Sequence, residues 1–251
     1  MASPKFPPAP GGAEKYIGHV AAGLVLRGHS VKALATEYEQ HLRFTLLPDD
    51  IPRREERDGV IVVRDRSIIW KRYGVFITPA MITRTLSTSA DVVFAVGLAY
   101  WPALAGTIGA RLSGKKLVLL PNFQFGGAPF HKAWRKILGP LIRRADAAVF
   151  YSEFERDLMK SDGHVPEISV IAPPGVSPLF FQDLPPRNVL ARYGVGGRPV
   201  VLSVGRVDEG KRLDILIRAA PIVIGSVPDA AFVVAGPDFG HTATLKELAI
   251  E

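Results

Sequence analysis

Short apolar segments alternate with helical patterns along the whole chain, and this alternation constrains the fold more than any other feature. Residues 31–35, 60–63, 91–96, 116–120, 147–151, 168–171, 200–204 and 231–235 are typical of buried strands. Helical patterns occur at 17–24, after 97, at 130–144, at 153–161 and from about 212. Apolar strands that alternate with helices indicate a parallel sheet covered on both faces. The sequence therefore predicts an α/β protein.

Local signals mark the ends of several predicted helices. Gly28 is placed as a C-terminal cap and Ser152 as an N-terminal cap. Proline predicts a break at Gly139-Pro140 and a kink or early end at Pro221. Residues 92–110 lack charge, but their glycines and proline favour a strand, a turn and a helix over a membrane span.

A change in composition predicts two domains. Residues 183–198 contain a Pro-Pro pair and three glycines, after which a new strand begins. We expect an N-terminal domain at 1–184, a linker at 185–198 and part of a second domain at 199–251.

The charge of the chain indicates anionic partners. The net charge is +7, which favours nucleotides or phospholipid headgroups, although an ordinary basic soluble protein has such a charge too. We expect no nucleic acid partner because no recognition motif accompanies the charge. The chain has no cysteine, and its six histidines lack metal-ligand spacing, so we expect no metal site. The lack of cysteine fits a reducing, cytoplasmic setting.

The loop that follows the strand 200–204 combines glycine with cations. Gly205, Arg206 and Lys211 lie where a strand gives way to a helix, the edge at which open α/β sheets bind ligands. Helix N-termini attract anions, and Arg and Lys can grip phosphate oxygens. Two interpretations stay open here: a diphosphate clamp, or two solvated cations paired with Asp208 and Glu209.

A second glycine turn precedes the first predicted helix. Gly11 and Gly12 can cradle an anion or a sugar, or can form a flexible turn. Glu14 can meet an acceptor, or can stabilise the helix through its dipole.

The segment 131–144 is basic and amphipathic. It carries Lys132, Arg135, Lys136, Arg143 and Arg144 beside apolar residues. This pattern suits an anionic membrane surface and equally suits a solvated helix face.

Six stretches, in this order, resemble glycosyltransferase family 4, a group of GT-B enzymes. They are "FPPAPGGAE", "LVLRGHSVKALA", "RADAAVFYSEFERDLM", "VIAPPGVSPLFF", "VLSVGRVDEGKRLDILIRAA" and "VPDAAFVVAGP". No single stretch is decisive, but all six in the right order are highly specific.

The resemblance implies two Rossmann-like parallel-sheet domains facing across a cleft. The N-terminal domain would receive a glycan or lipid acceptor, and the C-terminal domain would hold a nucleotide-diphosphate sugar. The implied reaction is retaining transfer of a hexose without a bound metal or other cofactor. Arg206 and Lys211 match the cations that grip the donor diphosphate, and Gly11 and Gly12 match a glycine loop that faces the cleft.

The chain departs from the family pattern at three places. Where members often have a histidine facing the donor sugar, this chain has Asn122 and Gln124, whose amides can bind a hydroxyl but cannot act as a base. Only two residues precede Ser3, so we expect the central first strand to be missing and its neighbours to be left unpaired. A C-terminal glutamate pair that binds ribose and sugar in relatives lies beyond Glu251. We therefore expect a fragment that does not transfer sugar alone.

Three functions remain in contention from the sequence. The first is a hexosyltransferase of the cytoplasm, which the basic segment could place at the inner membrane face. The second is a truncated, non-catalytic binding module. The third is a basic peripheral-membrane protein on a Rossmann-like scaffold.

Overall fold

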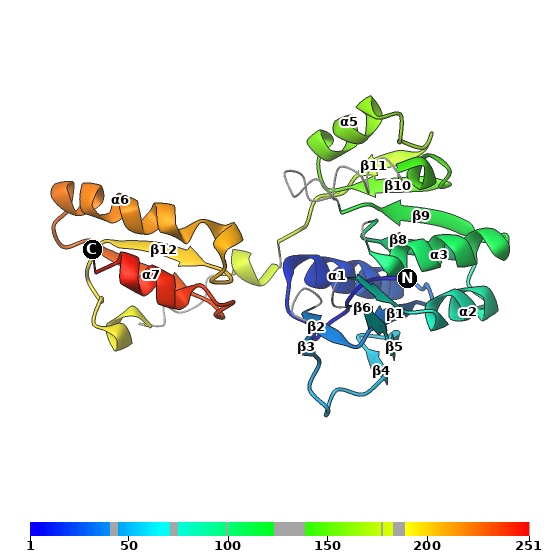
Figure 1. Ribbon diagram of the computed structural model, residues 1–251, viewed down its shortest axis with the longest axis horizontal. Helices are drawn as coiled ribbons and strands as arrows, with labels where there is room; N and C mark the ends of the chain where they lie inside the picture. Colours follow the sequence, from blue (N-terminus) through cyan, green and yellow to red (C-terminus); the bar gives the residue numbers. More distant parts are fainter. Residues whose placement is uncertain are drawn as a thin grey trace. The chain divides into compact units, whose positions relative to one another are not determined.

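The computed structural model describes residues 1–40, 45–70, 75–98, 100–122, 139–176, 178–182 and 189–250. The chain forms two compact units, residues 1–177 and residues 178–251 (Figure 1). Each unit is an α/β structure, as the sequence predicts. The division falls after residue 177, whereas the predicted linker spans 185–198, of which residues 185–188 lie outside the described residues. The predicted boundary stays a prediction.

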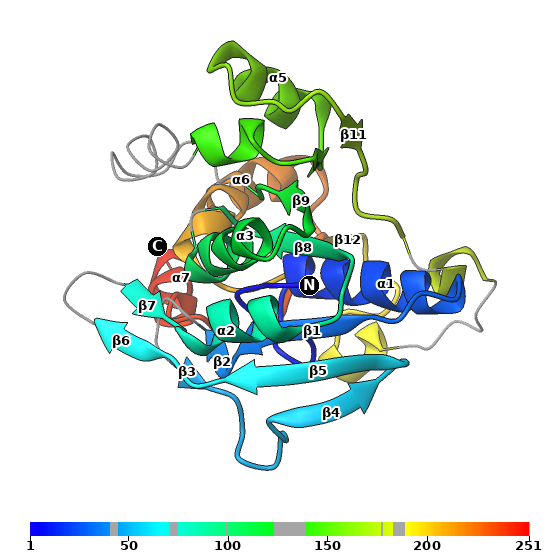
Figure 2. The same ribbon diagram turned by 90° about the vertical axis from the view of Figure 1, so that its right-hand side faces the viewer.

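The first unit is built on parallel strands in two groups. One group has the order β1-β5-β4 and the other β11-β10-β9-β8. The strands are β1 (Lys32–Thr36), β4 (Arg54–Arg57), β5 (Val60–Asp65), β8 (Val92–Val96), β9 (Lys116–Leu120), β10 (Ala147–Phe150) and β11 (Ser169–Ile171). Among these seven strands, only β4 runs antiparallel to its neighbour, and it lies beside β5 at the edge (Figure 2).

Residues at the start of the chain join the two groups of strands. Ala2 forms parallel bridges to Leu34 of β1 and to Ala95 of β8. The Ala2 amide donates to Phe94 O at 2.8 Å, and the Val96 amide donates to Ala2 O at 2.9 Å. We expected β1 and β8 to lack a neighbour between them. That expectation is wrong where Ala2 pairs with both strands.

Helices cover both faces of this sheet. They are α1 (Gly12–Leu26), α2 (Ala80–Ser87), α3 (Trp101–Leu112) and α5 (Glu153–Ser161). Ile17 and Ala21 of α1 pack in one core cluster with Ala33 of β1, whereas Met81 of α2 packs against Leu34 on the other face. Side chains alternate between faces along a strand, so the apolar pattern of β1 fixes this two-sided cover.

Both predicted helix caps are confirmed. Gly28 has φ +87° after α1, and its amide donates to Val25 O at 2.9 Å. The Ser152 side chain accepts from the Glu155 amide at 3.2 Å at the start of α5. Residues 139–143 are helical, so the predicted break at Gly139-Pro140 falls at the edge of the described residues.

Within the uncharged segment 92–110, residues 92–96 form β8 and residues 101–110 belong to α3, as predicted. Among the helices in the described part of the chain, none combines the length and the apolar character that crossing a bilayer requires.

Several small elements were not predicted. β4 has the sequence "REER", whose charged residues give no apolar strand pattern. The sequence analysis also did not predict two antiparallel strand pairs. They are β2 (Tyr38–Gln40) with β3 (Thr45–Leu46) and β6 (Ile68–Trp70) with β7 (Val75–Ile77). Strands this short carry too few residues for a clear period of two.

The second unit contains two parallel strands and two helices. These are β12 (Val200–Val204), β13 (Ala231–Ala235), α6 (Leu213–Ser226) and α7 (Thr242–Leu248), with short 3-10 turns at Pro178–Phe181, Leu190–Tyr193 and Glu209–Lys211. The predicted early end at Pro221 is wrong, because α6 continues to Ser226. Leu202, Val204 and Ile222 are exposed large apolar side chains of this unit.

Candidate functional site

Two glycine-containing loops leave the carboxyl ends of β12 and β13 side by side. The strands pair in register from Val200 with Ala231 to Val204 with Ala235. The loops then stay together, since the Gly205 amide donates to Ala235 O and the Val207 amide to Pro237 O, both at 2.9 Å. A Cβ on Gly236 would collide with the Gly205 carbonyl oxygen, so glycine at 236 permits this close approach. The cation loop therefore has a defined backbone.

Arg206 is held from two sides. Its Nη2 lies 3.1 Å from Asp208 Oδ2, and its guanidinium carbon lies 5.1 Å from the centre of the Phe239 ring. The Arg206 side chain is 50% exposed, so solvent screens the ion pair. Arginine stacks well on aromatic faces, and Phe239 comes from the neighbouring loop. Arg206 is thus oriented while half of its surface stays accessible.

Lys211 lies on a short turn in front of the helix. The turn Glu209–Lys211 is capped by Asp208, whose Oδ1 accepts from the Lys211 amide at 3.1 Å. Within the described ranges the Lys211 ammonium has no hydrogen-bond or ion-pair partner, and the side chain is exposed. Of the two interpretations, the pairing with Asp208 applies to Arg206. Whether the loop is a diphosphate clamp stays a prediction.

The helix after the loop begins at Leu213. Arg212 occupies a left-handed conformation with φ 50° between the turn and α6. Its guanidinium makes two 3.0 Å hydrogen bonds to the Asp214 carboxylate, which lower the pKa of Asp214. Arg212 is therefore a third cation of the loop, engaged by its own helix.

The glycine turn of the first unit is organised by a buried ion pair. Lys5 Nζ lies 2.9 Å from Glu14 Oε1, and the two side chains are only 10% and 13% exposed. The Glu14 carboxylate folds over Gly11, where a Cβ would clash with it. Gly12 is the first residue of α1. Glu14 is thus engaged in the structure of the turn.

Tyrosines lie close to this turn. The Tyr16 and Tyr151 rings meet edge to face at 5.0 Å, and the Tyr16 hydroxyl donates to Ala172 O at 3.1 Å. Burial, followed by the charges of neighbours including Glu14, raises the pKa of Tyr151 well above its usual range. The buried Tyr151 hydroxyl has no hydrogen-bond partner among the described residues. The sequence analysis did not predict this cluster. Its signal in the sequence is the tyrosine of the "FYSEFE" stretch, which directly follows the apolar run of β10.

The remaining predicted residues are only partly described. Asn122 follows β9 with φ 46°, a left-handed conformation that asparagine tolerates. Arg143 and Arg144 are exposed. Gln124, Lys132, Arg135 and Lys136 lie outside the described residues. In the part of the chain that is described, no group of three His, Asp or Glu side chains is arranged to hold a metal ion.

Comparisons with known proteins agree with this architecture. The model of Glycosyltransferase Family 4 matches residues 10–178. The chain is 26% identical over 247 residues to the GDP-mannose-dependent alpha-(1-6)-phosphatidylinositol monomannoside mannosyltransferase of Mycolicibacterium smegmatis, covering 97% of this chain and 62% of that protein. It is 25% identical over 238 residues to a phosphatidylinositol N-acetylglucosaminyltransferase subunit of Saccharomyces cerevisiae, covering 92% of this chain and 51% of that protein.

The fold matches solved structures as well. Anabaena HepE in complex with UDP-glucose superposes with a TM-score of 0.67 at 18% identity, covering 99% of this chain and 64% of that one. The chain thus spans half to two thirds of the length of these proteins. Since the family model matches more than half of the chain, the chain belongs to glycosyltransferase family 4.

Proposed function

We propose that the protein transfers a hexose, with retention, from a nucleotide-diphosphate sugar to a glycan or lipid acceptor. The carrying observation is the cation loop, in which Arg206 is oriented by Asp208 and Phe239 while Lys211 has no partner among the described residues. Family membership supports the same reaction class.

The diphosphate is the part of the donor that this loop suits. The bond between the sugar and the diphosphate breaks, a bond to the acceptor hydroxyl oxygen forms, and the diphosphate leaves with the electron pair. Charge therefore builds on the leaving diphosphate, where fixed cations stabilise the transition state. Arg206 supplies a planar pair of donors and Lys211 a mobile point charge. Neither role needs a metal.

For the acceptor, we propose a molecule that contains phosphoinositol. The names of both relatives described above contain phosphatidylinositol. The glycine turn at Gly11 and Gly12, which lies beside Glu14 and Tyr151, is the acceptor-side candidate. Asn122 and Gln124 are candidates for contacts with sugar hydroxyls. The basic residues Arg143 and Arg144, with Lys132, Arg135 and Lys136, would hold the protein at an anionic membrane surface.

The test of the donor site is nucleotide binding by the chain itself. UDP and GDP are titrated calorimetrically against the wild type, Arg206→Ala and Lys211→Ala. Each substitution should weaken binding by about 1–3 kcal/mol, because a charge-assisted hydrogen bond is lost. Lys246→Ala, an exposed cation of α7 in the same unit, is the matched control. Unchanged affinity in both loop variants would remove the diphosphate assignment.

Turnover separates an enzyme from a binding module. Release of nucleoside diphosphate is measured with a panel of nucleotide sugars and phosphatidylinositol vesicles, with Lys211→Ala as the blank. Nucleotide binding without release above that blank favours the non-catalytic alternative. Binding to anionic vesicles that is steeply salt-dependent, with no nucleotide binding, favours the peripheral-membrane alternative.

A further inference from the structure

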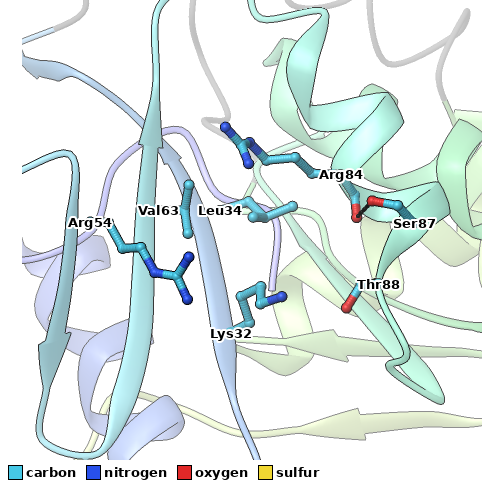
Figure 3. A pocket seen from close by; sticks show the side chains of 7 residues that line it. All are labelled: Lys32, Leu34, Arg54, Val63, Arg84, Ser87 and Thr88. Atoms are coloured by element: carbon cyan, nitrogen blue, oxygen red, sulfur yellow. Dashed lines mark hydrogen bonds between the residues drawn. The ribbon is translucent and has the colours of Figure 1, made fainter.

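A hollow in the first unit gathers cations and includes no residue of the cation loop or of the glycine turn. Register places Lys32 and Leu34 of β1, Val63 of β5 and Arg54 of β4 on one face of the sheet. The last turn of α2 closes the hollow with Arg84 and Ser87, followed by Thr88 (Figure 3). The space measures about 100 Å³. Its floor is apolar, and polar groups surround it.

Two of these cations lack an acidic partner. Among the described residues, neither Lys32 nor Arg54 forms an ion pair, whereas Arg84 Nε lies 2.8 Å from both oxygens of Asp65. Figure 3 shows the side chains of Lys32, Arg54 and Arg84 around those of Leu34 and Val63. This arrangement concentrates positive charge over an apolar surface.

Several other cations of the first unit are paired with carboxylates. Arg53 pairs with Glu37, Arg64 with Glu55 and Lys5 with Glu14, all within 3.1 Å. The one further carboxylate that register places on the face of the hollow is Glu56, opposite Ile61 and in the same row as Lys32. The hollow thus has three cations, Lys32, Arg54 and Arg84, and two nearby carboxylates. Of the carboxylates, Asp65 is paired with Arg84, which leaves Glu56.

We propose that the hollow binds a phosphate group, either inorganic phosphate or a phosphate monoester. Lys32 and Arg54 supply the charge, and the hydroxyl of Thr88 supplies a neutral donor. The Ser87 hydroxyl donates to Arg84 O at 3.4 Å in this structure and would have to turn to reach the phosphate. Lys32 and Arg54 are exposed, so solvent screens each contact, and binding depends on both cations acting on the same phosphate group. Lys32 is the first residue of β1, so the site lies toward the amino end of this strand, opposite the end that faces the glycine turn. The proposal is independent of the proposed function.

Inorganic phosphate is the first probe. It is titrated into the isotopically labelled chain at low ionic strength, and amide shifts are followed. Saturable shifts should appear at Lys32, Ser87 and Thr88. Lys32→Gln and Arg54→Gln should each weaken the affinity about tenfold, as expected when one charge-assisted contact of roughly 1.4 kcal/mol is lost.

Matched variants keep the test decisive. Arg156→Gln removes an equal charge from α5 and should leave the affinity unchanged. Glu56→Gln removes the competing carboxylate and should strengthen binding. Lys32→Arg keeps the charge and should bind phosphate, which separates charge loss from misfolding. No saturable shift in the wild type, or equal affinity in the folded Lys32→Gln and Arg54→Gln variants, would overturn the proposal.

A second measurement identifies the source of the phosphate group. Binding to vesicles of phosphatidic acid in phosphatidylcholine is compared with binding to phosphatidylcholine alone. Binding that Arg54→Gln weakens and free phosphate displaces supports a lipid phosphate as the ligand. Phosphate binding with equal partitioning onto both vesicles supports a soluble phosphate or monoester.

Discussion

The ion pair between Lys5 and Glu14 should hold the glycine turn of the first unit, and a double-mutant cycle can measure this. The variants are Lys5→Met, Glu14→Gln and the combination of both. Methionine keeps most of the length of the lysine side chain, and glutamine keeps the shape of glutamate. Each single variant leaves one charged group largely buried beside a neutral partner.

The expected cost follows from the burial of the pair. Breaking a buried ion pair on one side typically costs about 3–5 kcal/mol, because a charge is left uncompensated. The two side chains retain 10% and 13% exposure, and Lys5 Nζ also lies 3.5 Å from Pro10 O. We therefore expect about 2–3 kcal/mol for each single variant, below the fully buried range. The double variant removes both charges and should cost less than the sum by about 2 kcal/mol.

Urea unfolding followed by tryptophan fluorescence is the suitable assay. All three tryptophans, at positions 70, 101 and 134, belong to the first unit, so the signal reports on this unit alone. Lys15→Met, a change of the same type at an exposed position of α1, is the control and should change the unfolding free energy little. Additive costs in the double variant would show that the pair is not coupled, and the account of the turn would fail.

Three further outcomes are expected. Gly236→Ala should destabilise the second unit by about 1–3 kcal/mol, because the new methyl group would collide with the Gly205 carbonyl. Hydrogen exchange should then become faster in peptides of β12 and β13. Unchanged exchange would contradict the close approach of the two loops. Asp146→Asn should cost about 1 kcal/mol at neutral pH, because the hydrogen bond from the Leu117 amide lowers the pKa of Asp146. This stability is present above the ordinary aspartate pKa and is lost as the pH falls through the lowered value, so wild type and variant should converge in acid. Ser152→Ala should cost about 1 kcal/mol of first-unit stability by removing the cap of α5, and Ser152→Asp should restore it.

The long elements were predictable because their signals are local. The apolar runs of β8, β9 and β12 and the caps at Gly28 and Ser152 depend on residues adjacent in sequence. β4 was missed because an edge strand exposes charged side chains, and its four residues read as a polar connection. Register and tertiary pairing, which decide such a strand, leave no local pattern.

The candidate site divides in the same way. Arg206 and Lys211 could be found because a glycine and two cations follow a strand directly. The partners that orient Arg206 could be found only in part, since Phe239 comes from a loop thirty-odd positions further on. The Lys5 and Glu14 pair crosses a proline-rich turn, and no helical or strand spacing brings those two positions together.

The bridge at Ala2 has a consequence for how the first unit folds. β1 pairs with β5, and β8 with β9, through five residue pairs each, whereas a single bridge residue joins the two groups of strands. The strand pairs within each group join residues that are closer in sequence than Ala2 and Ala95, which pair across the two groups. We therefore expect each group to form first and the two groups to dock afterwards. The docking is secured mainly by side chains, because Val96 and Leu120 of one group share a core cluster with Ala33 and Val62 of the other. Cooperative unfolding of the whole unit therefore depends on this cluster, and weakening it should let the two halves open as separate units.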